Sequence, residues 1–186
     1  MAATACIIMS GPSGVGKTTM AQKLIAQLPQ LSRVITTTTR APRTGEKHGL
    51  DYFFVSPQAF SELAAAQAFL EINQFGSAAY ATPRSVLHSL RTGTSRLILP
   101  DIHGAQKLLQ FIPHATTIWL AAPLEVLAAR LAARQTESQL QQEHRLTIAA
   151  QEMQLAKDLN IYKHTIDMTD FEKAEDAVLC ILKTIL

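Results

Sequence analysis

The sequence predicts one α/β domain whose core is a parallel sheet with helices on both faces. Short apolar runs recur at residues 5–9, 97–99 and 116–122, and helix-forming stretches separate them. This alternation is typical of parallel strands joined by crossover helices. The length of 186 residues is close to that of a single domain. We therefore expect one domain over residues 1–186.

Composition narrows the class of protein. Hydrophobic residues make up 47% of the chain and charged residues 17%, which is typical of a globular protein with a buried core. The net charge is +2 without a long basic block, so we expect no nucleic-acid surface. We find no signal peptide pattern and no apolar segment long enough for a membrane span. Cys6 and Cys180 lie in separate apolar runs, which predicts buried free thiols and a cytoplasmic location.

The first half of the chain predicts a strand, a helix and an inserted lobe. The strand at residues 5–9 leads through a glycine-rich turn to a helix at 18–28, whose apolar residues follow the helical period. Strand candidates at 34–39, 52–55 and 69–75 then predict a small mixed-β lobe inserted at residues 34–82. Two hydroxyl-proline pairs are typical helix starts, namely Ser56-Pro57 and Thr82-Pro83.

The second half predicts a helical lid and a closing helix. Residues 123–160 are helix-forming, and 134–145 are charged and glutamine-rich with few large apolar side chains. We expect a mobile hairpin of two helices there. An apolar stripe over residues 171–186 predicts a last helix packed on the sheet. The expected division is a core of residues 1–33, 83–122 and 146–186, a lobe of 34–82 and a lid of 123–145.

One motif carries strong chemical information. Residues 11–18 read GPSGVGKT and lie between a predicted strand and a predicted helix, as a phosphate-binding P-loop requires. In such a loop the backbone N–H groups wrap a phosphate, the lysine reaches the outer phosphates and the threonine hydroxyl can hold Mg²⁺. The expected nucleotide-binding residues are Gly11, Ser13, Gly14, Val15, Gly16, Lys17, Thr18 and Thr19. A P-loop serves several reactions, so a second site must name the acceptor.

That second site is predicted at residues 36–54. The chain reads TTTTRAPRTGE at 36–46 and GLDYFF at 49–54. Two guanidinium groups and a tyrosine hydroxyl close together suit a phosphomonoester dianion, because they bind its oxygens at several points. In these motifs and their order the chain resembles the guanylate kinase family, and the resemblance covers nearly the whole sequence.

The resemblance implies a P-loop NTPase-type core with a nucleoside-monophosphate-binding lobe and a lid. The implied reaction moves the γ-phosphoryl group of ATP to GMP or dGMP, with ATP and Mg²⁺ as cofactors and no macromolecular partner. A carboxylate suits guanine, which presents two adjacent donors, N1–H and N2–H. By resemblance the guanine contacts are Thr36, Glu71 and Thr82, and the acceptor-phosphate contacts are Arg40, Arg43, Tyr52 and Tyr80.

Further roles follow from the same resemblance. Glu46 belongs to the acceptor motif and is expected to contact substrate. Asp101 either approaches substrate and hydrated Mg²⁺ or caps the next helix, and the two roles are compatible. Lid arginines are expected at Arg130, Arg134 and Arg145, with the first two on the nucleotide. The expected catalytic residues are Lys17, Arg40, Arg43, Arg134 and Arg145.

Several positions depart from the family pattern around the nucleotide sites. They are Leu99, Pro100, Ala78, Ala79, Ala81, Gln135 and Met168. Their effect on donor and acceptor specificity stays open, as does the choice between monomer and homodimer. Two other readings also stay open: a kinase of another phosphorylated metabolite such as a sugar phosphate, and a catalytically weak paralogue or interaction module. The intact Lys17 argues against a module.

Overall fold

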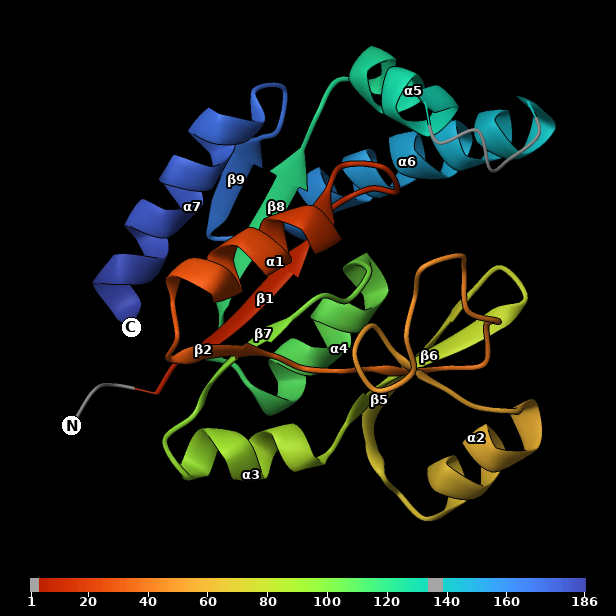
Figure 1. The fold of residues 1–186 in the computed structure, drawn as a ribbon, viewed down its shortest axis with the longest axis vertical. Helices are drawn as coiled ribbons and strands as arrows, with labels where there is room; N and C mark the ends of the chain where they lie inside the picture. Colours follow the sequence, from red (N-terminus) through yellow and green to blue (C-terminus); the bar gives the residue numbers. More distant parts are fainter. Residues whose placement is uncertain (1–3, 134–138) are drawn as a thin grey trace.

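The main sheet has five parallel strands in the order β2-β7-β1-β8-β9 (Figure 1). The computed structural model describes residues 4–133 and 139–186. Along the chain these strands are β1 (Cys6–Ser10), β2 (Leu31–Arg33), β7 (Ser95–Ile98), β8 (Thr116–Ala121) and β9 (His164–Asp167). Strand β1 is central and pairs with β7 on one side and β8 on the other. The loop after β1 therefore emerges at the middle of the carboxyl edge, where α/β sheets bind ligands.

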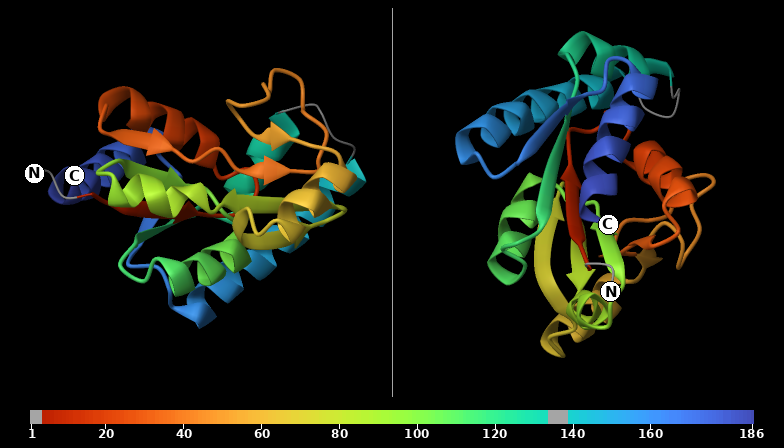
Figure 2. Two further views of the ribbon diagram at one scale, coloured as in Figure 1. Left: turned by 90° about the horizontal axis from the view of Figure 1, so that it is seen from below. Right: turned by 90° about the vertical axis from the view of Figure 1, so that its left-hand side faces the viewer.

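Helices cover both faces of this sheet, which confirms the predicted class (Figure 2). Successive strand residues point to opposite faces, so Ile7 and Met9 pack with α1 (Lys17–Gln27) and α7 (Phe171–Ile185). Ile8 points the other way and packs with α3 (Ser85–Arg91) and α4 (Ile102–Phe111). Side chains at 0% exposure on both sides give the loop a rigid platform.

A separate small sheet lies beyond the carboxyl edge of the main one, in the order β4-β3-β6-β5. Its strands are β3 (Thr37–Thr38), β4 (Phe53–Phe54), β5 (Phe69–Phe75) and β6 (Ala78–Pro83). Strands β3 and β4 are parallel and the other pairs antiparallel, so the sheet is mixed, as predicted. Helix α2 (Pro57–Ala65) begins where Ser56 accepts a hydrogen bond from Ala59 N–H, which confirms that predicted start.

The second predicted helix start is wrong. Thr82 and Pro83 end strand β6, and α3 begins at Ser85 without a side-chain cap. Because β6 pairs with β5 from residue 78 to 83, the ladder outweighs the local threonine-proline signal. The tight turn of this hairpin lies at Gly76, whose φ is +61°, so Ala78, Ala79 and Ala81 need no glycine. Three strands were not predicted from the sequence, namely β2, β6 and β9.

The predicted helical hairpin consists of α5 (Leu124–Ala133) and α6 (Gln139–Leu159). Its connection includes Arg134 and Gln135, which lie outside the described residues. Helix α6 continues well past residue 145, where the lid was expected to end, and buries Ala149 and Ala156 against the core. Helix α5 buries Leu127 and Leu131, so the hairpin is packed on the body at both helices.

The cysteine prediction is half wrong. Cys6 is buried in the sheet, and burial raises the pKa of its thiol to about 12. Cys180 is exposed, because it lies on the solvent side of α7, whose buried residues are Ala174, Val178, Leu179 and Leu182. Among the described residues no helix has the length and apolar character that crossing a membrane requires.

Candidate active site

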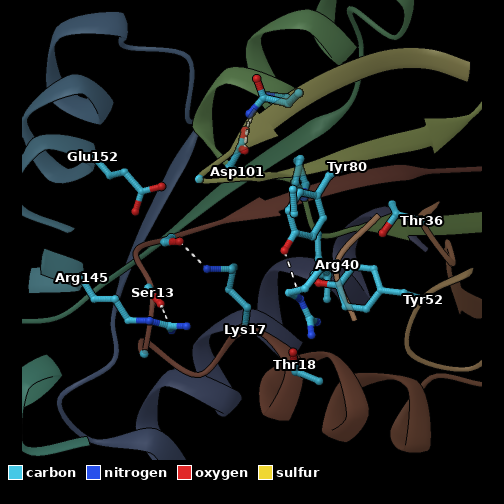
Figure 3. Close-up of a pocket in the computed structure, with 18 of the residues that line it drawn as sticks. Ser13, Lys17, Thr18, Thr36, Arg40, Tyr52, Tyr80, Asp101, Arg145 and Glu152 are labelled. Carbon is cyan, nitrogen blue, oxygen red and sulfur yellow. Dashed lines mark hydrogen bonds between the residues drawn. The ribbon is translucent and has the colours of Figure 1, made fainter. Parts of the chain in front are cut away.

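A cleft of about 580 Å³ lies between the P-loop and the small sheet (Figure 3). Its walls come from the loop and first turn of α1, from the acceptor block, from the β5-β6 hairpin and from α6. The predicted site residues that line it are Gly11, Ser13, Gly14, Gly16, Lys17, Thr18, Thr19, Thr36, Arg40, Arg43, Tyr52, Glu71, Tyr80, Thr82, Asp101 and Arg145. Segments far apart in the sequence thus meet at one cleft.

The loop needs its glycines for two different reasons. Gly14 and Gly16 have φ of +87° and +108°, a region that other residues adopt only with strain. A Cβ on Gly11 would lie 2.6 Å from the carbonyl oxygen of Leu120. The Lys17 ammonium donates to the carbonyl oxygens of Gly11 at 2.5 Å and Pro12 at 3.1 Å. Its charge therefore lies within the loop that would hold a phosphate.

Val15 is the one predicted loop residue that does not line the cleft. Its side chain is fully buried in the core, and its N–H donates to the carbonyl oxygen of Pro12 at 3.3 Å. Thr18 and Thr19, by contrast, are exposed on the first turn of α1. Both residues line the cleft at the start of the helix, where the helix dipole is positive.

Arg40 is held rigidly on the acceptor side. Its guanidinium group donates to Tyr80 OH at 3.1 Å and to both carboxylate oxygens of Glu46 at 2.9 Å. It also lies 5.4 Å from the ring centroid of Tyr52. Arg43 is exposed and lines the cleft beside it. Two guanidinium groups and two phenol groups therefore face one space.

Glu46 lies behind Arg40 and does not line the cleft. Its carboxylate also accepts from the backbone N–H of Arg43 at 2.7 Å. Burial works to raise the pKa of Glu46, but the hydrogen bonds from Arg40 and Arg43 lower it. Glu46 thus binds the side chain of Arg40 and the backbone of Arg43, and it does not reach the cleft where the predicted substrate contact would lie.

The other end of the acceptor side is a buried carboxylate. Glu71 is 7% exposed, and one of its oxygens accepts from the hydroxyl of Thr82, which is fully buried, at 2.8 Å. Its other oxygen is buried without a hydrogen-bond partner among the described residues. Burial raises the pKa of Glu71. Thr36 also lines the cleft.

Asp101 caps helix α4. Its Oδ1 accepts from Gly104 N–H at 2.7 Å, and its Oδ2 accepts from the side-chain amide of Asn73. Leu99 and Pro100 line the cleft just before it, so the wall beside Glu71 is apolar at that point. The described residues contain no group of three or more His, Cys, Asp or Glu side chains fit to hold a metal.

The lid arginines divide into two kinds. Arg145 donates to the Ser13 hydroxyl at 2.8 Å and lines the cleft. Arg130 turns away from the cleft and donates to the carbonyl oxygens of Val15 at 3.1 Å and Met168 at 2.6 Å. Met168 is fully buried, and its methyl group lies beneath Gly16. Arg130 therefore connects the P-loop to the residue that follows β9. The sequence analysis had predicted that Arg130 contacts the nucleotide.

The cleft residues missed from the sequence include Asn73 and Glu152. Asn73 holds Asp101, and no sequence signal marks it. Glu152 lies on α6 two helical turns after Arg145, on the same face of the helix. The seven-residue spacing between Arg145 and Glu152 was a usable signal in the sequence. If Arg145 reaches the P-loop, then an acidic residue on the same face of the helix lies near the loop as well.

The geometry defines a class of protein: a P-loop phosphotransferase with an acceptor cleft formed by an inserted small sheet. A family model described as "Guanylate kinase" matches residues 3–184. The chain belongs to the guanylate kinase family.

Individual relatives agree over nearly the full length. The chain is 36% identical over 174 residues to a guanylate kinase of Trichormus variabilis, covering 92% of this chain and 86% of that one. It is 34% identical over 182 residues to a guanylate kinase of Rubrobacter xylanophilus, covering 97% and 94%. A crystal structure of guanylate kinase from Anaplasma phagocytophilum matches with a TM-score of 0.80 at 28% identity, covering 98% and 86%. A shikimate kinase from Bacteroides thetaiotaomicron shares the fold, with a TM-score of 0.56 at 14% identity.

Proposed function

We propose that the protein transfers the γ-phosphoryl group of MgATP to GMP or dGMP, giving ADP and GDP or dGDP, in the cytoplasm. Family membership and the names of the relatives support the reaction. The observation that carries the choice of base is Glu71, whose buried oxygen has no partner in the described structure. Guanine offers N1–H and N2–H to such an acceptor, whereas adenine presents a lone pair at N1.

The residues divide the work between donor and acceptor. The loop N–H groups and Lys17 would bind the donor phosphates, and Arg40, Arg43, Tyr52 and Tyr80 would bind the phosphate of GMP. Such transfer needs little covalent chemistry from the protein, because alignment and charge neutralisation supply most of the rate. The contact of Arg145 with Ser13 in the cleft supports the proposal that this arginine approaches the transferring group. Arg134, which lies outside the described residues, is proposed as a catalytic arginine on the family resemblance alone.

Magnesium fits the residues of the loop. Thr18 presents an exposed hydroxyl group at the start of α1, and Mg²⁺ in kinases takes few protein ligands beside phosphates and water. We propose that Thr18 holds Mg²⁺ and that Asp101, whose oxygens both accept N–H donors, acts on it only through water. The ion would neutralise the phosphate charge that develops during transfer.

A coupled assay of ADP release against a panel of monophosphates tests the proposal. GMP and dGMP are expected to give the highest kcat/KM, with AMP, CMP and UMP far lower. Because the arginine pair alone would bind any phosphomonoester, sugar phosphates belong in the panel. Clear turnover of a sugar phosphate without turnover of GMP or dGMP would contradict the proposed acceptor.

A further inference from the structure

Helix α6 brings to the cleft a carboxylate that the proposed reaction does not use. Glu152 lines the cleft and points toward the P-loop (Figure 3). Its Oε2 is buried and has no hydrogen-bond partner among the described residues. A buried carboxylate oxygen without a partner lowers the stability of the folded protein, because its hydrogen bonds to water are lost and no protein hydrogen bond replaces them. Groups of this kind gather at functional sites, where position matters more than stability.

One face of α6 approaches one residue of the loop, Ser13. Glu152 points toward the loop, where the backbone N–H of Ser13 acts to lower the pKa of its carboxyl group. The hydroxyl of Ser13 accepts from Arg145 at 2.8 Å. Because Glu152 and Arg145 are two helical turns apart, they project from the same face of the helix. Arg145 therefore binds the side chain of Ser13, and Glu152 lies near the backbone of the same residue.

The groups around Glu152 have opposing effects on the pKa of its carboxyl group. Burial raises the pKa of Glu152 to about 7, even though the Lys17 ammonium and the Ser13 N–H favour the ionised form. Asp101 adds repulsion, and the Tyr162 phenol group lies within electrostatic reach from the loop before β9. His103 lines an adjoining cavity together with Asp101 and Glu152. Lys17 is thus the positive group whose interaction favours ionised Glu152.

We propose that Glu152 is a positioning residue for phosphoryl transfer, which fixes Ser13 together with Arg145 and holds the Lys17 ammonium by its negative charge. The inference rests on the proposed function. Glu152 touches neither nucleotide in this scheme, since it acts through the loop and its lysine. Small displacements of such groups reduce rates strongly, because the reacting atoms must stay aligned.

Two variants separate charge from contact. E152Q keeps a carbonyl oxygen for Ser13 N–H and removes the charge, and E152M keeps the volume and removes both. The matched control is D158N, an exposed carboxylate on the same helix that accepts only from Gln154 in the described structure. With saturating MgATP and GMP, we expect kcat to fall about 10-fold in E152Q and about 10²-fold in E152M. D158N is expected to match the wild type.

A second readout needs no acceptor. Amide hydrogen exchange of the ligand-free protein reports how firmly residues 11–18 are held. We expect their exchange to be about tenfold faster in E152M than in the wild type and unchanged in D158N. If the wild type phosphorylates no monophosphate, the proposed function fails, and this exchange still decides the role of Glu152.

Stability and pH give the third readout. The pKa of Glu152 is higher in the folded protein than in the unfolded chain, so protonated Glu152 favours the folded state. This contribution to the stability of the fold is complete below the pKa of an unfolded glutamate, and it is lost as the pH rises through about 7. E152M should therefore gain in Tm relative to the wild type from about pH 5 to about pH 8. The ratio of wild-type to E152Q kcat should rise over the same range, since the wild type alone gains the charge.

A purely structural role gives the opposite pattern. It predicts a lower Tm in E152M at every pH, with kcat and loop exchange unchanged. Loop exchange and kcat equal to the wild type in a folded E152M protein would overturn the proposal while leaving the proposed function in place.

Discussion

Lys17 and Glu71 mark the two ends of the cleft, and a different physical effect defines each. The Lys17 ammonium contacts backbone oxygens of the loop, and in the proposed reaction it presents a positive charge to phosphate. Glu71 is buried, and one of its oxygens has no partner among the described residues, so in the proposed reaction it recognises donors on a base. Under this proposal, charge selects the phosphate and the unpaired carboxylate oxygen selects the base.

The first prediction concerns Lys17. Lys17→Ala should leave the fold intact and lower kcat by about 10² or more, the scale of losing a preorganised charge at the transition state. Steady-state turnover of GMP is the measurement, with Lys23→Ala, an exposed lysine on the same helix, as the control. A folded Lys17→Ala enzyme with nearly normal turnover would refute the assigned role.

The second prediction concerns Glu71. Glu71→Gln keeps the shape but exchanges one acceptor for a donor, which faces N1–H or N2–H of guanine unfavourably. A site built to bind such donors rejects an analogue that lacks them by roughly 10⁴-fold, because its polar groups stay unpaired. The ratio of kcat/KM for GMP over AMP should therefore collapse in the variant. An unchanged ratio would place the carboxylate outside the base site; Glu62→Gln, exposed on α2, is the control.

At the scale of elements, the acceptor block behaves as one rigid unit. Arg40, Glu46 and Tyr80 come from a loop and a strand that are separate in sequence, and they meet in one hydrogen-bonded group. The carboxylate of Glu46 also closes the loop by accepting from Arg43 N–H. The arginine fork is thus preorganised before substrate arrives, which reduces the entropy lost on binding.

The third prediction tests this unit. Glu46→Gln removes the negative partner of Arg40 without touching the cleft, so the KM for GMP should rise about tenfold, the scale of one charge-assisted hydrogen bond. The KM for MgATP should stay the same, since the P-loop is untouched. Thr44→Ala, an exposed position in the same loop, is the control. A Glu46→Gln enzyme whose two KM values rise together would point to general misfolding of the site.

At the scale of the whole molecule, the cleft must both admit nucleotides and close over them. Its arginines come from the loop after β3 on one side and from α6 on the other. Closing a kinase cleft excludes water and brings positive charge to the transferring group. We expect residues 34–82 and 123–145 to move inward when both substrates bind.

The fourth prediction is therefore a compaction. Small-angle scattering should give a smaller radius of gyration with GMP and a nonhydrolysable MgATP analogue together than for the free protein. Either nucleotide alone should give a smaller change, because each contacts one side of the cleft only. An unchanged radius with both sites filled would contradict closure.

Some of the site could be predicted from the sequence because its residues are neighbours in the chain. The P-loop at residues 11–18 folds by local rules of glycine conformation and helix start, so its place between β1 and α1 followed from the pattern. The acceptor block also lies within one short segment. The alternation of apolar runs predicted the parallel sheet, since periodicity reports which faces are buried.

Tertiary structure decided what depends on distant partners. Thr82 had a helix-start signal but lies in the last part of β6, because pairing with β5 satisfies its backbone and its hydroxyl donates a hydrogen bond to Glu71. Glu46 was predicted to contact the substrate and instead binds Arg40. Arg130 was predicted to contact the nucleotide and instead donates to backbone carbonyl oxygens. The sequence by itself determined the fold class and the phosphate loop, whose signals are local. The partner of each charged side chain was decided only where the packed elements meet, because a long side chain reaches whichever opposite charge or carbonyl the tertiary fold brings near.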